Sequence, residues 1–126
     1  MSDQRTFTIE EANSLIPRLR KLLKRLIHHR GQLVELNPEI QKARDNAEFN
    51  GGSFSGGQYL LELIRFSECA QAIETMGVII KDLDSGLCDF PHFREGRIVY
   101  LCWRLGEDEI GWWHDVESGF AGRRPI

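Results

Sequence analysis

The segment RIVYLCWRLGEDEIGWWH, from Arg97 to His114, decides the fold of this chain. Two short runs of β-branched and aromatic residues flank a polar stretch that contains glycine, a pattern typical of a β-hairpin. With residues 105–109 as the loop, Cys102 faces Trp112 across the two strands. In this register Tyr100 faces His114, so Tyr100, Cys102, Trp112 and His114 share one face, and Trp103 and Trp113 lie on the other.

A second hairpin is predicted just before the first. The stretch GVIIKDLDSGLCDF, residues 77–90, contains a β-branched run, a turn signal at Asp84-Ser85-Gly86 and a second short run. Together the two hairpins predict one antiparallel sheet of about four strands. Residues 118–126, SGFAGRRPI, are expected to fold back on this sheet, because tryptophans on both of its faces need cover.

The N-terminal half has helical periodicity. Thr8 and Glu11 form a capping box that starts a helix, and apolar residues then recur at spacings of three and four. Pro17 lies inside this pattern and predicts either a kink or a short first helix followed by a longer one. Asn37-Pro38 is a second candidate break, although helical composition continues to Phe49.

A glycine-rich stretch separates this helix from the next. NGGSFSGG, Asn50 to Gly57, predicts a loop that joins two antiparallel helices. The second helix is expected from about Gln58, with Gly77 as the residue that ends it. Its predicted inner face consists of Leu60, Leu63, Ile64, Ala70, Ile73 and Met76.

The predicted class is therefore α+β, a long antiparallel helical hairpin followed by a small antiparallel sheet. The length of 126 residues favours one domain over residues 1–126. Within it, the helical hairpin covers about 8–76 and the β-rich part about 77–126.

Composition limits the compartment and the partners. The net charge is −3, and neither half is charged enough to demand nucleic acid or membrane. The start lacks the apolar region of a secretion signal, and no apolar run approaches the roughly 20 residues that span a membrane. Cys69, Cys88 and Cys102 cannot all pair within one chain and show no CxxC spacing, which favours reduced thiols. We expect a cytoplasmic protein without membrane contact.

Four polar side chains at strand ends or turns are candidates for binding a divalent metal: Asp82, Asp89, Glu107 and His114. A histidine with carboxylates can hold such an ion or share a proton. A structural alternative stays open, in which aspartates cap turns and the histidine donates to a backbone carbonyl. A zinc site built from Cys88, His92, Cys102 and His114 is less favoured, because the spacing matches no zinc finger.

Two stretches are candidates for binding anions. Gly119 and Gly122 leave backbone N–H groups unobstructed near Arg123, which suits a small anionic ligand, although such glycines also suit a tight turn. PRLRKLLKRLIHHR, Pro17 to Arg30, holds six Lys/Arg and two His. No aromatic residue is interleaved with these charges, so a solvated helix face is favoured over nucleic-acid binding.

The chain also contains FTIEEAN and LIP near its start, then GVIIKDLDSGLCDFP, VYLCWRLGEDEI and WHDVESGFAGRRPI. These motifs, which span nearly the whole chain, resemble a small bacterial family of unknown function, family number 2203. The resemblance implies a stand-alone cytoplasmic protein with a helical hairpin and a sheet, and it implies no activity. The family motif falls on Lys81, Asp82, Gly86, Asp89, Phe90, Pro91, Cys102, Trp103, Gly106, Glu107, Trp113, His114, Gly119 and Arg123.

The favoured hypothesis is a protein, catalytic or not, that binds a small ligand or divalent metal in a polar pocket at the sheet edge. Asp82, Asp89, Glu107 and His114 are the expected metal ligands, and Lys81, Trp113 and Arg123 are the expected ligand-binding residues. The alternative is a non-catalytic homodimer that uses the helical hairpin, because a short chain has little material to cover its apolar surfaces. The candidate shared surface is Leu19, Leu22, Leu26, Leu60 and Leu63, unless these form the internal core. Nucleic-acid binding by the basic helix face is third.

Overall fold

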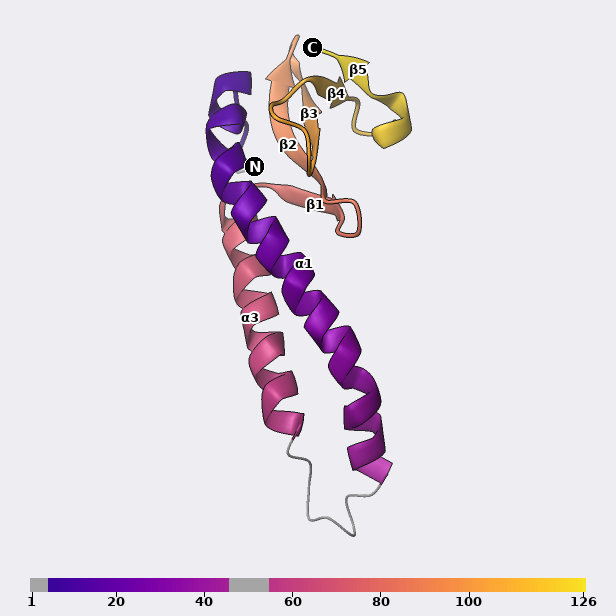
Figure 1. The fold of residues 1–126 in the computed structure, drawn as a ribbon. Coiled ribbons are helices and arrows are strands. Elements are labelled where there is room, and N and C mark those ends of the chain that lie inside the picture. Colours follow the sequence, from indigo (N-terminus) through magenta and orange to yellow (C-terminus); the bar gives the residue numbers. More distant parts are fainter. Residues whose placement is uncertain (1–4, 46–54) are drawn as a thin grey trace.

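The computed structural model describes residues 5–45 and 55–126. Two helices precede one antiparallel sheet (Figure 1), which confirms the predicted α+β class with its helical hairpin. The helices are α1 (Ile9–Asp45) and α3 (Ser55–Thr75). The strands are β1 (Ile79–Asp82), β2 (Leu87–Arg94), β3 (Arg97–Arg104), β4 (Trp112–His114) and β5 (Arg124–Pro125), with a 3-10 turn η1 (Phe120–Gly122) before the last.

The sheet is a meander, because its strands follow the chain in the order β1-β2-β3-β4-β5. The described residues form five strands where about four were expected. The additional strand is β5, which pairs with β4 through Trp112 opposite Pro125 and Trp113 opposite Arg124. The C-terminal segment therefore folds back on the sheet, as predicted, and does so by extending it.

The helix α1 begins at the predicted capping box. Glu11 N donates to Thr8 Oγ1 at 3.0 Å, and Thr8 N donates to Glu11 Oε1 at 2.8 Å. The helix then runs unbroken through Pro17 and through Asn37-Pro38. The predicted alternative of a short first helix is wrong. Pro17 removes one hydrogen bond of the helix, but the helix continues because its buried apolar face extends on both sides of Pro17.

The core lies between that face of α1, the end of α3 and one side of the sheet. Leu19 and Leu26 are buried in it, so they form internal core and not a surface shared with a second chain. Trp103 and Phe90 are fully buried on the sheet side. The α1 residues of this core follow the helical repeat of three and four: Ala12, Ile16, Leu19, Leu23 and Leu26.

The helix α3 departs from prediction at its first half. It begins at Ser55, so residues 55–57 of the expected loop belong to its first turn, and the remainder of that loop lies outside the described residues. Ile73 and Met76 are buried as predicted, whereas the assignment of Leu60, Leu63 and Ile64 to the inner face is wrong, with 41–56% of these side chains exposed.

The reason is visible in Figure 1, where the hairpin extends well beyond the sheet. No described α1 side chain after Leu26 is buried. One contact between the helices there is polar, with His29 Nδ1 and Glu62 Oε2 2.6 Å apart. Helical periodicity reveals an apolar face but cannot tell whether another element covers it.

The predicted register of the C-terminal hairpin is confirmed. Cys102 pairs with Trp112, and Tyr100 pairs with His114. The strand β4 begins at Trp112 and not directly after the predicted loop of residues 105–109, because residues 110 and 111 form other bonds. Ile110 N donates to Asn13 Oδ1 at 2.7 Å, and Gly111 O accepts from Ile126 N at 3.0 Å.

The strand β2 is longer than predicted and ends in a hairpin of its own. A two-residue turn, Glu95-Gly96, connects it to β3, and both residues have positive φ, 49° and 81°. Positive φ at both central positions matches the tight turns whose twist suits antiparallel strands. Pro91 lies where β1 no longer covers the edge of β2, and its carbonyl accepts from Phe7 N at 2.7 Å. A proline is tolerated there because no ladder bond needs its missing N–H.

Among the described residues, no helix has the length and apolar character that crossing a membrane requires.

Candidate metal centre

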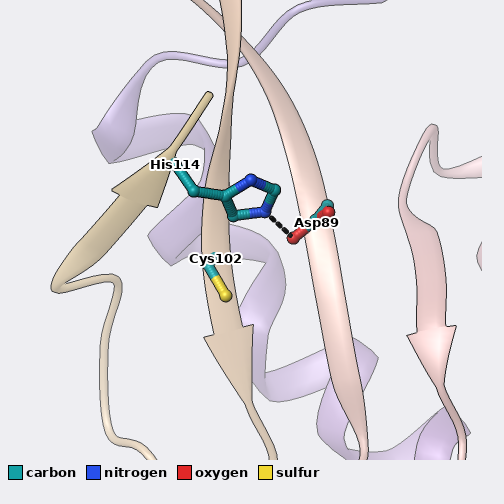
Figure 2. A group of neighbouring side chains, drawn as sticks. All are labelled: Asp89, Cys102 and His114. Carbon is teal, nitrogen blue, oxygen red and sulfur yellow. Dashed lines mark hydrogen bonds and ion pairs between the residues drawn. The ribbon is translucent and has the colours of Figure 1, made fainter. Parts of the chain in front are cut away.

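Three neighbouring strands bring one acid, one thiol and one imidazole together. Asp89 on β2 is the partner of Cys102 on β3, and His114 on β4 lies two residue pairs further along, opposite Tyr100. One ligand atom from each residue lies within 4.8 Å of the others (Figure 2). The three side chains are 1%, 0% and 3% exposed. They point away from the helices, because strand side chains alternate and their neighbours Phe90, Leu101 and Trp113 face the apolar core.

The hydrogen bonds of His114 define its protonation. Nδ1 lies 2.7 Å from the carbonyl oxygen of Asp115, and Nε2 lies 3.0 Å from Asp89 Oδ1. A carbonyl only accepts, so Nδ1 carries a hydrogen and donates it. The proton between Nε2 and the carboxyl therefore belongs to the pair, which holds it either as two neutral groups or as an ion pair.

Burial makes the carboxyl of Asp89 costly to ionise. Desolvation raises its pKa, and the hydrogen bond and charge of His114, followed by the charge of Lys81, act in the opposite direction. Its second oxygen, Oδ2, is buried and has no hydrogen-bond partner. Buried polar atoms almost always have a partner, so this oxygen could accept a hydrogen bond or a cation.

The thiol of Cys102 is not a nucleophile in this arrangement. Burial, followed by the nearby Asp89 charge, raises its pKa to about 11, although Arg123 acts against this. A catalytic cysteine needs a base that removes its proton, and in this structure Nε2 of His114 bonds to Asp89 and not to the thiol. A soft sulfur beside an imidazole and a carboxyl is instead the donor set of a transition metal.

A guanidinium and an ammonium lie at opposite ends of this triad of Asp89, Cys102 and His114. Arg123 donates from Nη2 to both carboxylate oxygens of Glu107, at 2.8 and 2.9 Å, and its guanidinium lies 4.8 Å from the centre of the Trp112 ring. Arg123 Nε is buried and, like Asp89 Oδ2, has no partner. At the other end, the Lys81 ammonium lies 5.5 Å from the Tyr100 ring, and that ring lies 5.5 Å from the His114 ring.

Of the four expected metal ligands, the structure brings Asp89 and His114 together and places the other two elsewhere. Asp82 is the last residue of β1, and its carboxylate accepts from Ser85 Oγ of the following turn at 2.7 Å. Glu107 pairs with Arg123, and its main-chain oxygen accepts from Trp103 Nε1 at 2.9 Å.

The four-residue zinc set is also divided. Cys88 belongs to the apolar core on the helix side, and His92 Nδ1 donates to Phe7 O at 2.6 Å. All three cysteines are free. Of the expected ligand-binding residues, Lys81 and Arg123 flank the triad, whereas Trp113 lies on the helix side and packs between Arg94 and Arg124.

The sequence analysis placed Asp89 and Cys102 in two different metal sets and did not combine them. The signal that joins them is the Glu95-Gly96 turn. A two-residue turn fixes the β2–β3 register, and that register sets Asp89 directly opposite Cys102.

Two hollows lie near this sheet. One of about 510 Å³, lined in part by Arg97, Ile98, Asp115 and Val116, adjoins the triad through Asp115, whose carbonyl orients His114. The other, of about 490 Å³, lies on the helical side. The basic stretch of α1 is partly engaged within the chain, since Arg30 pairs with Asp84 and Arg20 Nη2 donates to Glu107 O at 3.5 Å.

Comparison with protein families gives one match. The family described as "Uncharacterized conserved protein (DUF2203)" matches residues 5–126, so the chain belongs to that family, as its motifs predicted. No curated protein matches the chain. No solved structure matches it either.

Proposed function

We propose that this member of the family binds a divalent transition metal, with zinc as the best fit, through Asp89, Cys102 and His114. The observation that carries the proposal is the convergence of three buried ligand atoms within 4.8 Å. Sulfur, imidazole nitrogen and carboxylate oxygen are the three donor types that zinc takes in proteins. The unpartnered Asp89 Oδ2 adds an oxygen that a cation would satisfy.

The geometry around His114 supports the same assignment. Metal-binding histidines usually donate their second ring N–H to a carbonyl or carboxylate, which fixes the ring. Here the bond from Nδ1 to Asp115 O has that role and leaves Nε2 for the metal. Zinc ligands at their usual bond lengths lie about 3.3 Å apart in a tetrahedron, close to the 3.0 Å between Nε2 and Asp89 Oδ1.

Metal binding would displace two protons, one shared by Asp89 and His114 and one from the Cys102 thiol, so the affinity should rise with pH. Three protein ligands leave a fourth tetrahedral position for water or a small ligand. A metal with such a position can act as a Lewis acid.

The experiment is metal analysis of protein purified without a histidine tag, followed by titration with Zn(II) and Co(II). We expect one metal per chain, a metal-dependent rise in Tm, and a thiolate-to-cobalt charge-transfer band. Cys102→Ser should lose the band and the Tm rise, and Asp89→Asn should weaken binding. Cys69→Ser, a free cysteine on α3, is the matched control and should behave like the wild type.

A folded wild-type protein that takes up less than a tenth of an equivalent of metal, as an approximate threshold, contradicts the proposal. Equal cobalt spectra for Cys102→Ser and the wild type contradict it too.

A second candidate function is homodimerisation through the first half of α3. Leu60, Leu63 and Ile64 are 41–56% exposed there, while the side facing α1 is joined by the polar His29–Glu62 contact. Two copies that pack this apolar face on its equivalent would bury it twice in one symmetric contact.

Light scattering at about 100 µM tests this, with a dimer expected for the wild type and a monomer for the double variant Leu60→Gln/Leu63→Gln. Val116→Gln is the control, since this exposed side chain lies at the sheet. A monomeric wild type contradicts the candidate.

We also propose a cytoplasmic location in a bacterium. The free state of Cys69, Cys88 and Cys102 supports a reducing compartment. Fractionation of cells that produce the protein from its own gene tests this, and recovery from an oxidising compartment would contradict it.

A further inference from the structure

A groove of about 490 Å³ lies where the first turns of α1 pass the last turns of α3. Its volume is within the range of small-molecule sites. Leu15, Ala72 and Met76 contribute its apolar lining. Figure 1 shows the described start of the chain beside the end of α3 and the start of β1.

Two arginines from separate parts of the chain line this groove. Arg5 is held in place, because its Nη1 donates to Met76 O at 3.1 Å and its guanidinium lies 4.4 Å from the centre of the Phe7 ring. Arg18 is exposed on α1, three residues after Leu15. Among residues 5–45 and 55–126, neither arginine forms an ion pair with a carboxylate.

The charged residues that line the groove are two arginines and one acid, Glu68, so the lining itself is net positive. Glu11, outside the lining, offsets part of the Arg5 charge, since that guanidinium contributes to the lowered pKa of the Glu11 carboxyl after the larger effect of the hydrogen bonds with Thr8. Gln71 and Thr75 supply neutral hydrogen-bonding groups at the same site.

We propose that this groove binds a small organic anion, with one carboxylate or phosphate group between Arg5 and Arg18 and an apolar body on Leu15, Ala72 and Met76. Guanidinium groups bind both anions through paired N–H donors. The apolar lining selects a ligand with a hydrocarbon part over a bare inorganic ion.

Amide NMR shifts in the full chain test the proposal with four probes, which are hexanoate, hexyl phosphate, neutral hexanamide and inorganic phosphate. We expect saturable shifts at Ala72 and Thr75 with at least one of the two organic anions. Hexanamide and inorganic phosphate should bind at least about tenfold more weakly, since each lacks one half of the recognised chemistry.

Arg18→Gln should weaken binding of the organic anion about tenfold. The matched control is Arg25→Gln, which removes an exposed arginine two turns further along α1, outside the groove. The same spectra report whether each variant is folded. Cys102→Ser should bind the anion as the wild type does, so a failed metal proposal and a failed anion proposal give different results.

Three results would overturn the proposal: no saturable shift with either organic anion, hexanamide binding as strongly as hexanoate, or undiminished binding by folded Arg18→Gln. Inorganic phosphate that matches hexyl phosphate would also overturn it, because the apolar lining would then contribute nothing.

Discussion

The two faces of the sheet bury their side chains by different means, and the two buried cysteines show the difference. Cys88 and Cys102 lie on neighbouring strands, and burial is the main cause that raises the pKa of the first to about 12 and of the second to about 11. Cys88 lies among apolar side chains between the helices and the sheet. Cys102 lies on the other face with Asp89 and His114, and two polar atoms beside it have no partner.

Burial alone therefore does not mark a functional cysteine. The helix face is complete without a ligand, because apolar side chains satisfy one another by contact. The outer face is incomplete, because a buried carboxyl oxygen costs free energy until it gains a partner. The four predictions that follow separate a packed face from a polar one.

The largest effect is expected on the helix face. Trp103→Ala removes a fully buried indole and its hydrogen bond to Glu107 O of 2.9 Å. Such substitutions cost about 3–5 kcal/mol of unfolding free energy, measurable by urea denaturation. Trp112 lies on the other face and is only partly buried, so Trp112→Ala should lower the unfolding free energy clearly less. Equal losses for the two tryptophans would refute the assignment of the core to one face.

Much of this fold could be predicted from the sequence, because the patterns that indicate it are local. The capping box of Thr8 and Glu11 starts α1, and the aromatic alternation around Cys102 and Trp112 set the register that the structure shows. The prediction for the first half of α3 was wrong for a physical reason. Leu60 and Leu63 repeat as a buried face does, but the sheet that would cover them does not extend that far.

The candidate site was predicted only in part, because it depends on pairing between distant residues. Asp89 and His114 are 25 positions apart and were both expected near strand ends. Their convergence with Cys102 requires the β2–β3 register, which a two-residue turn sets. Which polar groups then remain unpartnered depends on all surrounding contacts, and no sequence spacing encodes it.

The next effect concerns the ion pair beside the triad. Arg123→Gln removes the two bonds to Glu107, whose side chain is only 24% exposed, and leaves that carboxylate poorly paired. We expect a loss of about 1–3 kcal/mol in urea denaturation. Arg97→Gln removes a pair with Asp115 in which the arginine side chain is 55% exposed, against 12% for Arg123, and should cost less than about 1 kcal/mol. A larger loss of unfolding free energy for Arg97→Gln than for Arg123→Gln would contradict the expectation that the Arg123–Glu107 pair contributes more to stability.

A smaller effect depends on pH. In the unfolded chain Asp89 ionises near its ordinary pKa of 3.8, and in the folded, metal-free protein burial raises that pKa. Between the two values the Asp89 carboxyl is protonated in the folded chain and ionised in the unfolded chain, so the contribution of this carboxyl to stability falls as pH rises, by at most about 1.4 kcal/mol per pH unit. Below both values the group contributes nothing.

Asp89→Asn removes this contribution and keeps the shape of the side chain. Measured in the presence of a chelator, its unfolding free energy should fall less than that of the wild type as pH rises above 3.8. A wild type that instead gains stability relative to Asp89→Asn over this range would show that His114 and Lys81 outweigh desolvation. His92→Gln serves as the control for a partly buried imidazole outside the triad, with its bond to Phe7 O.

The smallest effect tests how far the outer-face electrostatics extend. Lys81 is exposed, and its positive charge lowers the pKa of Asp89 against the larger effect of burial. Lys81→Gln should change the unfolding free energy by less than about 0.5 kcal/mol, since a single exposed cation contributes little. It should nevertheless raise the pKa of Asp89 further, because the ionised carboxyl loses a favourable charge.

Carbon-13 NMR of the Asp89 carboxyl in the metal-free protein measures that shift. Lys24→Gln, at an exposed α1 position, should leave it unchanged. An Asp89 pKa that stays unchanged in Lys81→Gln, or that shifts equally in both variants, would show that the buried pair is insulated from the charge at the end of its own face.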